Sequence, residues 1–258
     1  MKGMTNRARI GCLVLGLSSL ASAGCGHATG AREVHIAAAA NLRAALDEIA
    51  RAFESRTGIH VVSTIGGTAQ LAQQIENGAP VEVFLAADTQ HVDQLIAKGV
   101  ADPQSRAIYA RGRLVLWAPQ RYDINSLRDL AGPKAGQVGC ARPELAPYGA
   151  AAVQALKKEG LWKVVEPKLV YGQSISAAKQ FADSGNVAAA FTALALVYGQ
   201  KGHYVLVDER LYDPLDQALC IVKQNAQQES AREFREFILG EEGRAILGRY
   251  GYTQPPAR

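Results

Sequence analysis

The first half of the chain alternates short apolar runs with segments of helical periodicity. The apolar runs span residues 34–40, 60–65, 81–86 and 114–119. Because they are short and rich in aliphatic or β-branched residues, they predict buried strands. Between the first two runs, apolar residues recur every three or four positions, which predicts a helix that begins at Asn41 and ends at Gly58. Asn41 is expected to cap this helix.

The second half repeats this alternation. Strands are predicted at 137–141, 168–171, 187–193, 204–207 and 218–223, and helices at 150–158, 175–182, 229–239 and 241–249. Alternating strands and helices are typical of an α/β fold, in which helices cover both faces of a parallel sheet. A chain of 258 residues is long enough for two such lobes.

Two prolines mark the expected crossings between the lobes. The strand at 114–118 runs into Pro119, and Pro214 precedes the strand at 218–223. We therefore predict that lobe one comprises residues 31–119 and 217–258. Lobe two is expected to comprise residues 120–216 and to be inserted in lobe one. Ligands of such folds bind in a crevice at the carboxyl ends of the strands, here a cleft between the lobes.

The N-terminus has the three parts of an export signal. Basic residues precede an apolar stretch over residues 10–20, and the small-residue sequence Ala-Ser-Ala follows at 21–23. The apolar stretch is too short for a comfortable membrane span, which disfavours an uncleaved anchor. We predict a signal peptide over residues 1–24 and an exported protein, located in the periplasm or at the outer face of the membrane.

Cys25 follows this signal, and two kinds of processing are open to it. The sequence Ser22-Ala23-Gly24-Cys25 resembles a lipobox, but serine stands where a large aliphatic residue is usual. A lipid anchor on Cys25 is one alternative, and plain cleavage after Ala23 is the other.

The charge of the mature chain is nearly balanced. Without the three basic residues of the leader, the formal net charge falls from +4 to +1. No run rich in lysine or arginine remains, so the sequence lacks the electrostatic footprint of a nucleic-acid-binding protein.

Two cysteines, Cys140 and Cys220, remain beyond the N-terminal segment, each in an apolar, strand-like run. Buried free thiols are the expected state. A disulfide is the alternative that an oxidising compartment permits. The sequence has neither a C-x-x-C motif nor a Cys/His cluster, so no zinc site is expected.

Four predicted strand-to-helix junctions carry small, hydroxyl or amide residues. They lie at residues 39–41, 66–69, 146–149 and 173–175, two in each lobe. A helix N-terminus offers unpaired N–H donors and about half a positive charge. Four such ends that meet in one cleft would bind a dianion without lysine or arginine. A site made only of donors favours a fully deprotonated anion, because a protonated one brings an O–H with no acceptor to meet it.

Each junction has a simpler interpretation, because Asn, Thr and Ser at helix starts are ordinary caps. Sites of enzymatic chemistry are not indicated either. The sequence around Gly67 lacks the lysine of a phosphate-binding P-loop, no G-x-S-x-G motif occurs, and the histidines lack metal-ligand spacing. Asp88 follows a strand in the manner of a catalytic acid, but a cap or loop role is favoured because no partner can be assigned to it.

Several longer motifs share their order with one known family. They are Ala37-Ala38-Ala39-Ala40-Asn41-Leu42, the stretch 71–80, Ala86-Ala87-Asp88, the stretch 143–149, Ser184-Gly185-Asn186, Phe191-Thr192-Ala193-Leu194 and the stretch 248–252. With this set the chain resembles the periplasmic molybdate-binding proteins of ABC importers over about residues 33–252. The resemblance implies a two-lobed type II periplasmic-binding-protein fold, a monomer without a cofactor, and a bound molybdate or tungstate ion. It also implies a permease and its ATPase as partners.

The resemblance also assigns site residues. By position, the family's ligand-binding residues correspond to Ala40, Asn41, Gly67, Thr68, Tyr148 and Ile175. Asn41 and Ala40 match the first ligand loop as amide or side-chain donors, and Thr68 matches a serine that offers both its hydroxyl and its N–H. Tyr148 and Ile175 match positions that provide backbone N–H groups. Ala193 stands where some members place a tyrosine ligand.

Three departures bear on which anion binds. The family usually has Gly-Ser-Ser-Gly where this chain has Gly-Gly-Thr-Ala at 66–69, and often an asparagine where it has Ser174. Arg142 replaces a common asparagine, and a solvated surface role is favoured for it over one at the mouth of the site. A receptor for another anion such as sulfate or phosphate therefore remains an alternative, and an enzyme on the same scaffold is another.

Overall fold

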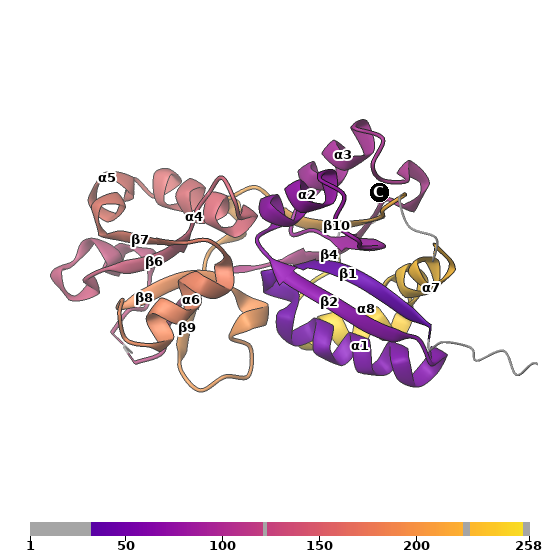
Figure 1. The fold of residues 1–258 in the computed structure, drawn as a ribbon. Helices are drawn as coiled ribbons and strands as arrows, with labels where there is room; N and C mark the ends of the chain where they lie inside the picture. Colours follow the sequence, from indigo (N-terminus) through magenta and orange to yellow (C-terminus); the bar gives the residue numbers. More distant parts are fainter. Residues whose placement is uncertain (1–31, 121–122, 224–227, 255–258) are drawn as a thin grey trace, which may run out of the picture. The chain divides into compact units, whose positions relative to one another are not determined.

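The structure is a computed structural model that describes residues 32–120, 123–223 and 228–254. The predicted signal peptide over 1–24 and Cys25 lie outside the described residues. From Ala31 onward the chain forms one compact unit. Within it the described strands build two five-stranded sheets. Figure 1 shows the sheets with the helices that pack on them.

The first sheet has the strand order β2-β1-β3-β10-β4. Its strands are β1 (Glu33–Ala39), β2 (His60–Gly66), β3 (Val83–Leu85), β4 (Ala107–Gly112) and β10 (Leu215–Ile221). Its helices are α1 (Arg43–Thr57), α2 (Thr68–Glu76), α3 (Gln90–Ala97), α7 (Gln228–Leu239) and α8 (Glu241–Arg249). We call this sheet with its helices lobe one.

The second sheet has the strand order β7-β6-β8-β5-β9. Its strands are β5 (Leu114–Ala118), β6 (Val138–Ala141), β7 (Leu169–Gly172), β8 (Ala189–Ala193) and β9 (His203–Leu206). Its helices are α4 (Pro147–Lys158), α5 (Trp162–Val165) and α6 (Ile175–Asp183). We call this group lobe two.

Short 3₁₀ turns complete the described elements. They are η1 (Ala40–Leu42), η2 (Pro103–Ser105), η3 (Leu127–Ala131), η4 (Pro133–Ala135), η5 (Glu166–Lys168), η6 (Leu194–Leu196) and η7 (Glu209–Leu211). No helix among the described residues is long and apolar enough to cross a membrane.

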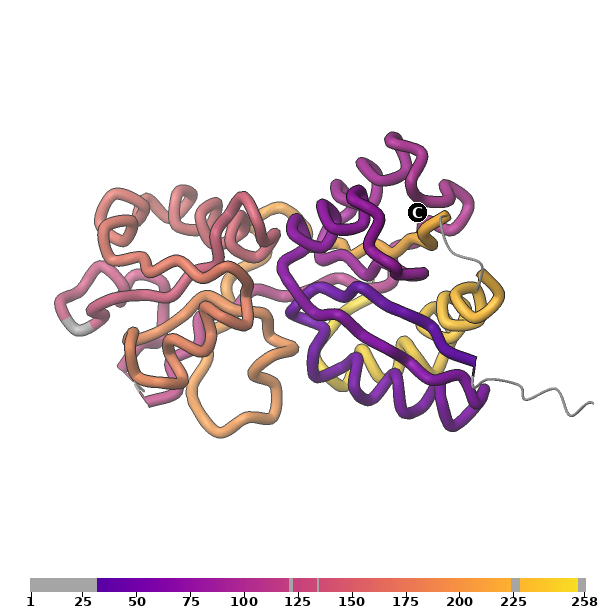
Figure 2. Tube along the Cα trace, in the orientation of Figure 1, coloured from indigo at the N-terminus to yellow at the C-terminus, as the bar shows by residue number. Residues whose placement is uncertain are grey.

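Helices cover both faces of the first sheet because the side chains of its strands alternate. Val34, Ile36 and Ala38 of β1 pack in one core with α1, α7 and α8. Ala37, between them, packs in another core with α2 and α3. Successive side chains of a strand point to opposite faces, so one apolar run serves two cores. Figures 1 and 2 show α2 and α3 on one face of this sheet and α1 and α8 on the other.

The chain changes sheets one strand earlier than the sequence predicts. The strand β5 was expected in lobe one, before a crossing near Pro119, but it pairs antiparallel with β8 and β9 of the second sheet. The chain therefore leaves the first sheet after Gly112 and returns to it with β10, which begins at Leu215. The hydrophobic pattern did not predict this crossing, because an apolar run does not reveal which strands it will pair with.

Neither sheet is wholly parallel, although a parallel arrangement was expected. The strands β2, β1 and β3 run parallel, whereas β10 is antiparallel to both β3 and β4. The strand β4 itself was not predicted. In the second sheet β7, β6 and β8 are parallel and β5 is antiparallel to β8. The strands that enter each sheet from the other lobe are the antiparallel ones.

The two described cysteines are free thiols. Cys140 lies in β6 and Cys220 in β10, and both are buried. The structure therefore supports the expectation of free thiols over the disulfide alternative. Burial raises the pKa of each thiol to about 12.

Candidate functional site

The first junction is the 3₁₀ turn η1, which runs directly into α1. Asn41 lies inside this turn and does not cap the helix, which corrects the prediction from sequence. Its side chain is buried, and its Nδ2 donates to Gln217 Oε1 at 2.9 Å and to Tyr252 Oη at 2.7 Å. Both amide hydrogens are thus used within the protein. The donor that Asn41 retains for a ligand is its backbone N–H.

The second junction is the start of α2. Gly67 is the N-cap residue, and Thr68 is the first residue of the helix. The Thr68 side chain is buried, and its Oγ1 accepts the N–H of Ala87 at 3.4 Å. A hydroxyl has one hydrogen besides its acceptor lone pairs, so Thr68 keeps an O–H as well as an unpaired helix N–H.

The third junction is the start of α4, which begins earlier than the predicted helix. Pro147 occupies the first helical position, where its missing N–H is not needed. Tyr148 follows it and is buried. A Cβ on Gly149 would lie 2.2 Å from the carbonyl oxygen of Ala141, so only glycine lets this helix start directly against the end of β6.

The fourth junction is the start of α6. Ser174 caps it, because Ser174 Oγ accepts the N–H of Ala177 at 3.2 Å. Ile175 is the first helical residue, and its side chain is buried in the core of lobe two. The N–H of Ile175 is among the first donors of the helix, which have no acceptor within the helix.

The four junctions join one another in a ring. Ser176 of α6 donates its hydroxyl to the carbonyl oxygen of Ala40 at 3.2 Å. The N–H of Ala69 in α2 points to the carbonyl oxygen of Leu145, before α4, at 3.4 Å. A Cβ on Gly67 would lie 3.1 Å from the carbonyl oxygen of Gln173, before α6. We call residues 39–41, 66–69, 145–149 and 173–176 the junction ring.

Gln217 completes the ring and was missed by the sequence-based reasoning. Its Nε2 donates to Tyr148 Oη at 2.9 Å, and its Oε1 accepts from Asn41 Nδ2. It thereby joins the first junction to the third. The signal that identifies it is a glutamine within the apolar run of β10, since buried polar groups need partners.

The tyrosine side chains buried at the ring are polar but uncharged. Burial raises the pKa values of Tyr109, Tyr148 and Tyr252 well above the usual range, so these hydroxyls stay neutral. Arg142, the candidate cation near the mouth, is exposed, and its guanidinium lies 6.0 Å from the centre of the Tyr171 ring. This agrees with a surface role. The donors in the ring are helix N–H groups and hydroxyls.

Asp88 has the cap role that the sequence favoured. Its Oδ1 accepts the N–H of His91 at 3.0 Å, in the first turn of α3, and its Oδ2 lies 2.7 Å from His91 Nδ1. This contact also supplies the partner that could not be assigned from sequence. Among the described residues no group of His, Cys, Asp or Glu side chains is arranged to hold a metal ion.

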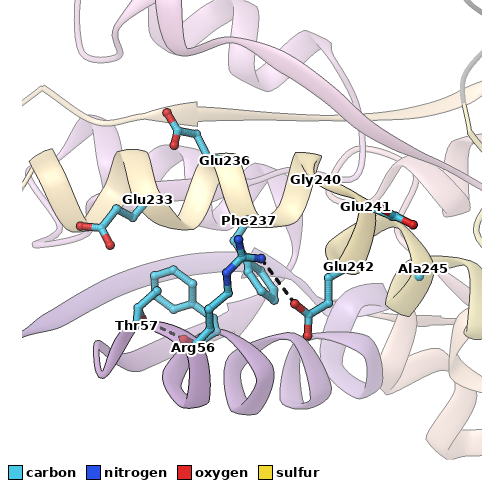
Figure 3. Close-up of a pocket in the computed structure, with 10 residues that line it drawn as sticks. Arg56, Thr57, Glu233, Glu236, Phe237, Gly240, Glu241, Glu242 and Ala245 are labelled. Carbon is cyan, nitrogen blue, oxygen red and sulfur yellow. Dashed lines mark hydrogen bonds and ion pairs between the residues drawn. The ribbon is translucent and has the colours of Figure 1, made fainter.

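A separate groove lies between α1 and the helices α7 and α8, as Figure 3 shows. Its volume is about 740 Å³. Phe53 and Phe237 line it together with charged residues, which are Arg56, Glu233, Glu236, Glu241 and Glu242. Arg56 lies 3.5 Å from Glu242, the contact that is dashed in Figure 3. No residue of the junction ring lines this groove.

The sequence pattern of the bacterial extracellular solute-binding proteins matches residues 34–253. The chain belongs to this family. It is 36% identical over 93% of its length to the molybdate-binding protein ModA of Rhodobacter capsulatus, of which it covers 93%. It is 38% identical over 86% of its length to ModA of Azotobacter vinelandii, of which it covers 90%.

A solved structure supports the fold of this solute-binding protein. The periplasmic molybdate-binding protein of Azotobacter vinelandii superimposes with a TM-score of 0.82 and 32% identity. The match covers 86% of this chain and 99% of that chain. The expected resemblance and the two-lobed α/β fold class are thus confirmed, and the relatives are named as binding proteins rather than enzymes.

Proposed function

We propose that this solute-binding protein holds molybdate or tungstate inside the junction ring and delivers it to the permease of an ABC importer. The observation that carries the proposal is the ring itself. Helix starts from both lobes contact one another, and none of them presents a lysine or arginine among the described residues. Such an arrangement suits a small anion that the protein surrounds with N–H groups.

The proposed donors are the N–H groups of Asn41, Thr68, Tyr148 and Ile175, together with the Thr68 hydroxyl. No turn, cap or loop hydrogen bond among the described residues occupies these four N–H groups. Ala40 and Gly67 contribute through their backbones. The carbonyl oxygen of Ala40 accepts a hydrogen bond from the Ser176 hydroxyl. Because Gly67 has no side chain, α2 can approach lobe two closely. The proposed N–H and hydroxyl groups donate hydrogen bonds, and a set of donors favours a fully deprotonated tetrahedral dianion.

Binding is proposed to close the two lobes about a hinge. The chain crosses between the sheets at residues 112–114 and again at residues 212–215. The contacts from Ser176 to Ala40 and from Ala69 to Leu145 join the lobes away from the covalent crossings. We expect these contacts to form on closure, as in hinge motions around ligands.

The remaining parts of the proposal follow from the family. We propose an exported, monomeric receptor without a cofactor or catalytic residues, which meets a permease and its ATPase at the membrane. Cys25 is proposed to carry a lipid anchor, and mass spectrometry of the native N-terminus distinguishes this from plain cleavage after Ala23.

Titration calorimetry of the mature protein with molybdate, tungstate, sulfate and phosphate tests the ligand. We expect molybdate and tungstate to bind far more tightly than the other two. If sulfate or phosphate binds as tightly as molybdate, the anion is misassigned and the receptor class stands. If no oxyanion gives heat, the anion-receptor function is wrong. Small-angle scattering with and without molybdate tests closure, and an unchanged profile contradicts it.

A further inference from the structure

Gln217 is a buried polar residue in the first half of β10. Its side chain is 0% exposed. The register between β10 and β4 shifts between Gln217 and Ala218. An irregularity of this kind re-aims a side chain relative to the regular alternation of the strand.

The contacts of Gln217 span both lobes. Its Oε1 accepts from Asn41 Nδ2 and from the Tyr109 hydroxyl, each at 2.9 Å, and its Nε2 donates to Tyr148 Oη, also at 2.9 Å. Asn41 is held a second time by Tyr252, whose hydroxyl donates to the Asn41 carbonyl oxygen at 3.0 Å. The amide of Gln217 is therefore fixed in one orientation, with its oxygen toward lobe one and its nitrogen toward lobe two.

The backbone leaves room for this network at Gly112. A Cβ there would lie 1.9 Å from Tyr148 Oη and 2.5 Å from Gln217 Nε2. Gly112 ends β4 beside the crossing into lobe two, so the tyrosine hydroxyl reaches from α4 into the space next to the hinge. Any side chain at residue 112 would therefore occupy the space in which Tyr148 Oη meets Gln217 Nε2.

We propose that Gln217 is a positioning residue that fixes the separation between the Asn41 and Tyr148 donors, and thereby selects the larger molybdate ion over sulfate. This rests on the proposed function. The network joins one donor residue of each lobe through a single neutral side chain. Each end of the Gln217 amide has a buried hydrogen-bond partner, and bonds of this kind in a low-dielectric interior favour one arrangement strongly. Without it the N-terminus of α4 moves relative to Asn41, and the ring adapts to smaller anions.

The tests use Gln217→Met, which keeps the length of the side chain and removes its hydrogen bonds, and Tyr148→Phe, which keeps the backbone donor and removes only the hydroxyl. The matched control is Gln154→Met. Gln154 also links α4 to the crossing, through Asp213, but outside the ring. Each variant is titrated with molybdate and sulfate, and its unfolding temperature is measured without ligand.

We expect Gln217→Met to lower the molybdate affinity by about tenfold or more while changing the sulfate affinity less than about threefold. Tyr148→Phe should reproduce this loss of molybdate affinity. The double variant should bind molybdate within about twofold of the weaker-binding single variant, because the two residues share one hydrogen bond. Gln154→Met should leave both affinities unchanged.

A purely structural role would lower the unfolding temperature and leave the ratio of the two affinities unchanged, which overturns the proposal. An unaltered molybdate affinity in Gln217→Met, or additive losses in the double variant, also overturns it. If Gln217→Met does not fold, the ratio of the molybdate and sulfate affinities of Tyr148→Phe tests the proposal by itself. If the wild-type protein binds no oxyanion, the proposed function fails and this proposal fails with it; if the wild type binds molybdate and the ratio does not change, only this proposal fails.

Discussion

The junction ring and the groove between α1, α7 and α8 are made of opposite chemistry. The groove measures about 740 Å³ and has four glutamates against one arginine along its walls. The ring is built from backbone N–H groups, hydroxyls and buried side chains without charge. At about 6 Å and an effective dielectric constant of about 20, a dianion and one carboxylate repel each other by about 5.5 kcal/mol.

If the ring is the anion site, as we propose, the size of a hollow does not locate it. A tetrahedral ion needs a few donors at hydrogen-bond distance, and we propose that the four helix starts provide them. The groove has volume, but its carboxylates oppose an anion. We therefore expect changes in the ring to alter ligand binding and matched changes in the groove to leave it unaltered.

The largest expected effect comes from a negative charge in the ring. Aspartate is as good an N-cap as serine, so Ser174→Asp should preserve α6. Its carboxylate would repel the bound dianion, and we expect the molybdate affinity to fall by about 100-fold or more, or about 3 kcal/mol. Ala245→Asp places the same charge in the groove and should not affect binding. Equal affinities for the two variants in calorimetry would contradict the proposed site.

Removal of one hydroxyl should have a smaller effect. Thr68→Val keeps the shape of the side chain and removes the O–H that we assign to the ligand. We expect molybdate to bind about 1–3 kcal/mol more weakly. The control is Thr57→Val, because Thr57 lines the groove and its hydroxyl donates to the Phe53 carbonyl oxygen and accepts the N–H of Ile59. An unchanged molybdate affinity in Thr68→Val would show that the Thr68 hydroxyl does not contact the ligand.

The buried tyrosines should make the protein less stable at high pH. Burial raises the pKa of Tyr109 well above its usual value of about 10. The unfolded chain then loses this proton at a lower pH than the folded chain does, so the free energy of unfolding falls as pH rises above about 10. The slope is at most about 1.4 kcal/mol per pH unit for each hydroxyl.

Urea denaturation between about pH 8 and pH 11 measures this slope. Tyr109→Phe should make the slope shallower by the contribution of one group. Because the thiols of Cys140 and Cys220 titrate alike in both proteins, their contributions cancel in the comparison. Identical slopes would mean that Tyr109 is not shielded from solvent.

The smallest effect is expected in the groove itself. Arg56 and Glu242 form an ion pair at 3.5 Å with side chains 67% and 50% exposed. Exposed pairs contribute little, so Arg56→Ala should change the free energy of unfolding by about 0–1 kcal/mol. The molybdate affinity should not change. A loss of binding in Arg56→Ala would show that the groove, rather than the ring, determines the affinity.

Local signals in the sequence predicted much of the fold. Gly58 ends α1 in the left-handed conformation, and Ser174 caps α6, as expected. Asn41 was misinterpreted as a cap because the same residue type serves caps and buried networks. The strand β4 was missed, and β5 was assigned to the wrong sheet, because strand pairing depends on distant segments.

The candidate site divides in the same way. The four junctions are local features, since a helix start creates unpaired N–H groups wherever it occurs. The sequence by itself therefore indicated the four junctions, and its resemblance to the family assigned Thr68, Tyr148 and Ile175 as donors. It also determined that these donors carry no formal charge.

Only the tertiary structure decided how these donors meet. Ser176 reaches Ala40 across 136 positions of sequence, and Gln217 reaches Asn41 across 176. Such pairings depend on the order of the strands in the two sheets, and the hydrophobic pattern does not encode this order. The physical reason is that capping is a property of one segment, whereas a buried hydrogen bond needs two segments to be packed together.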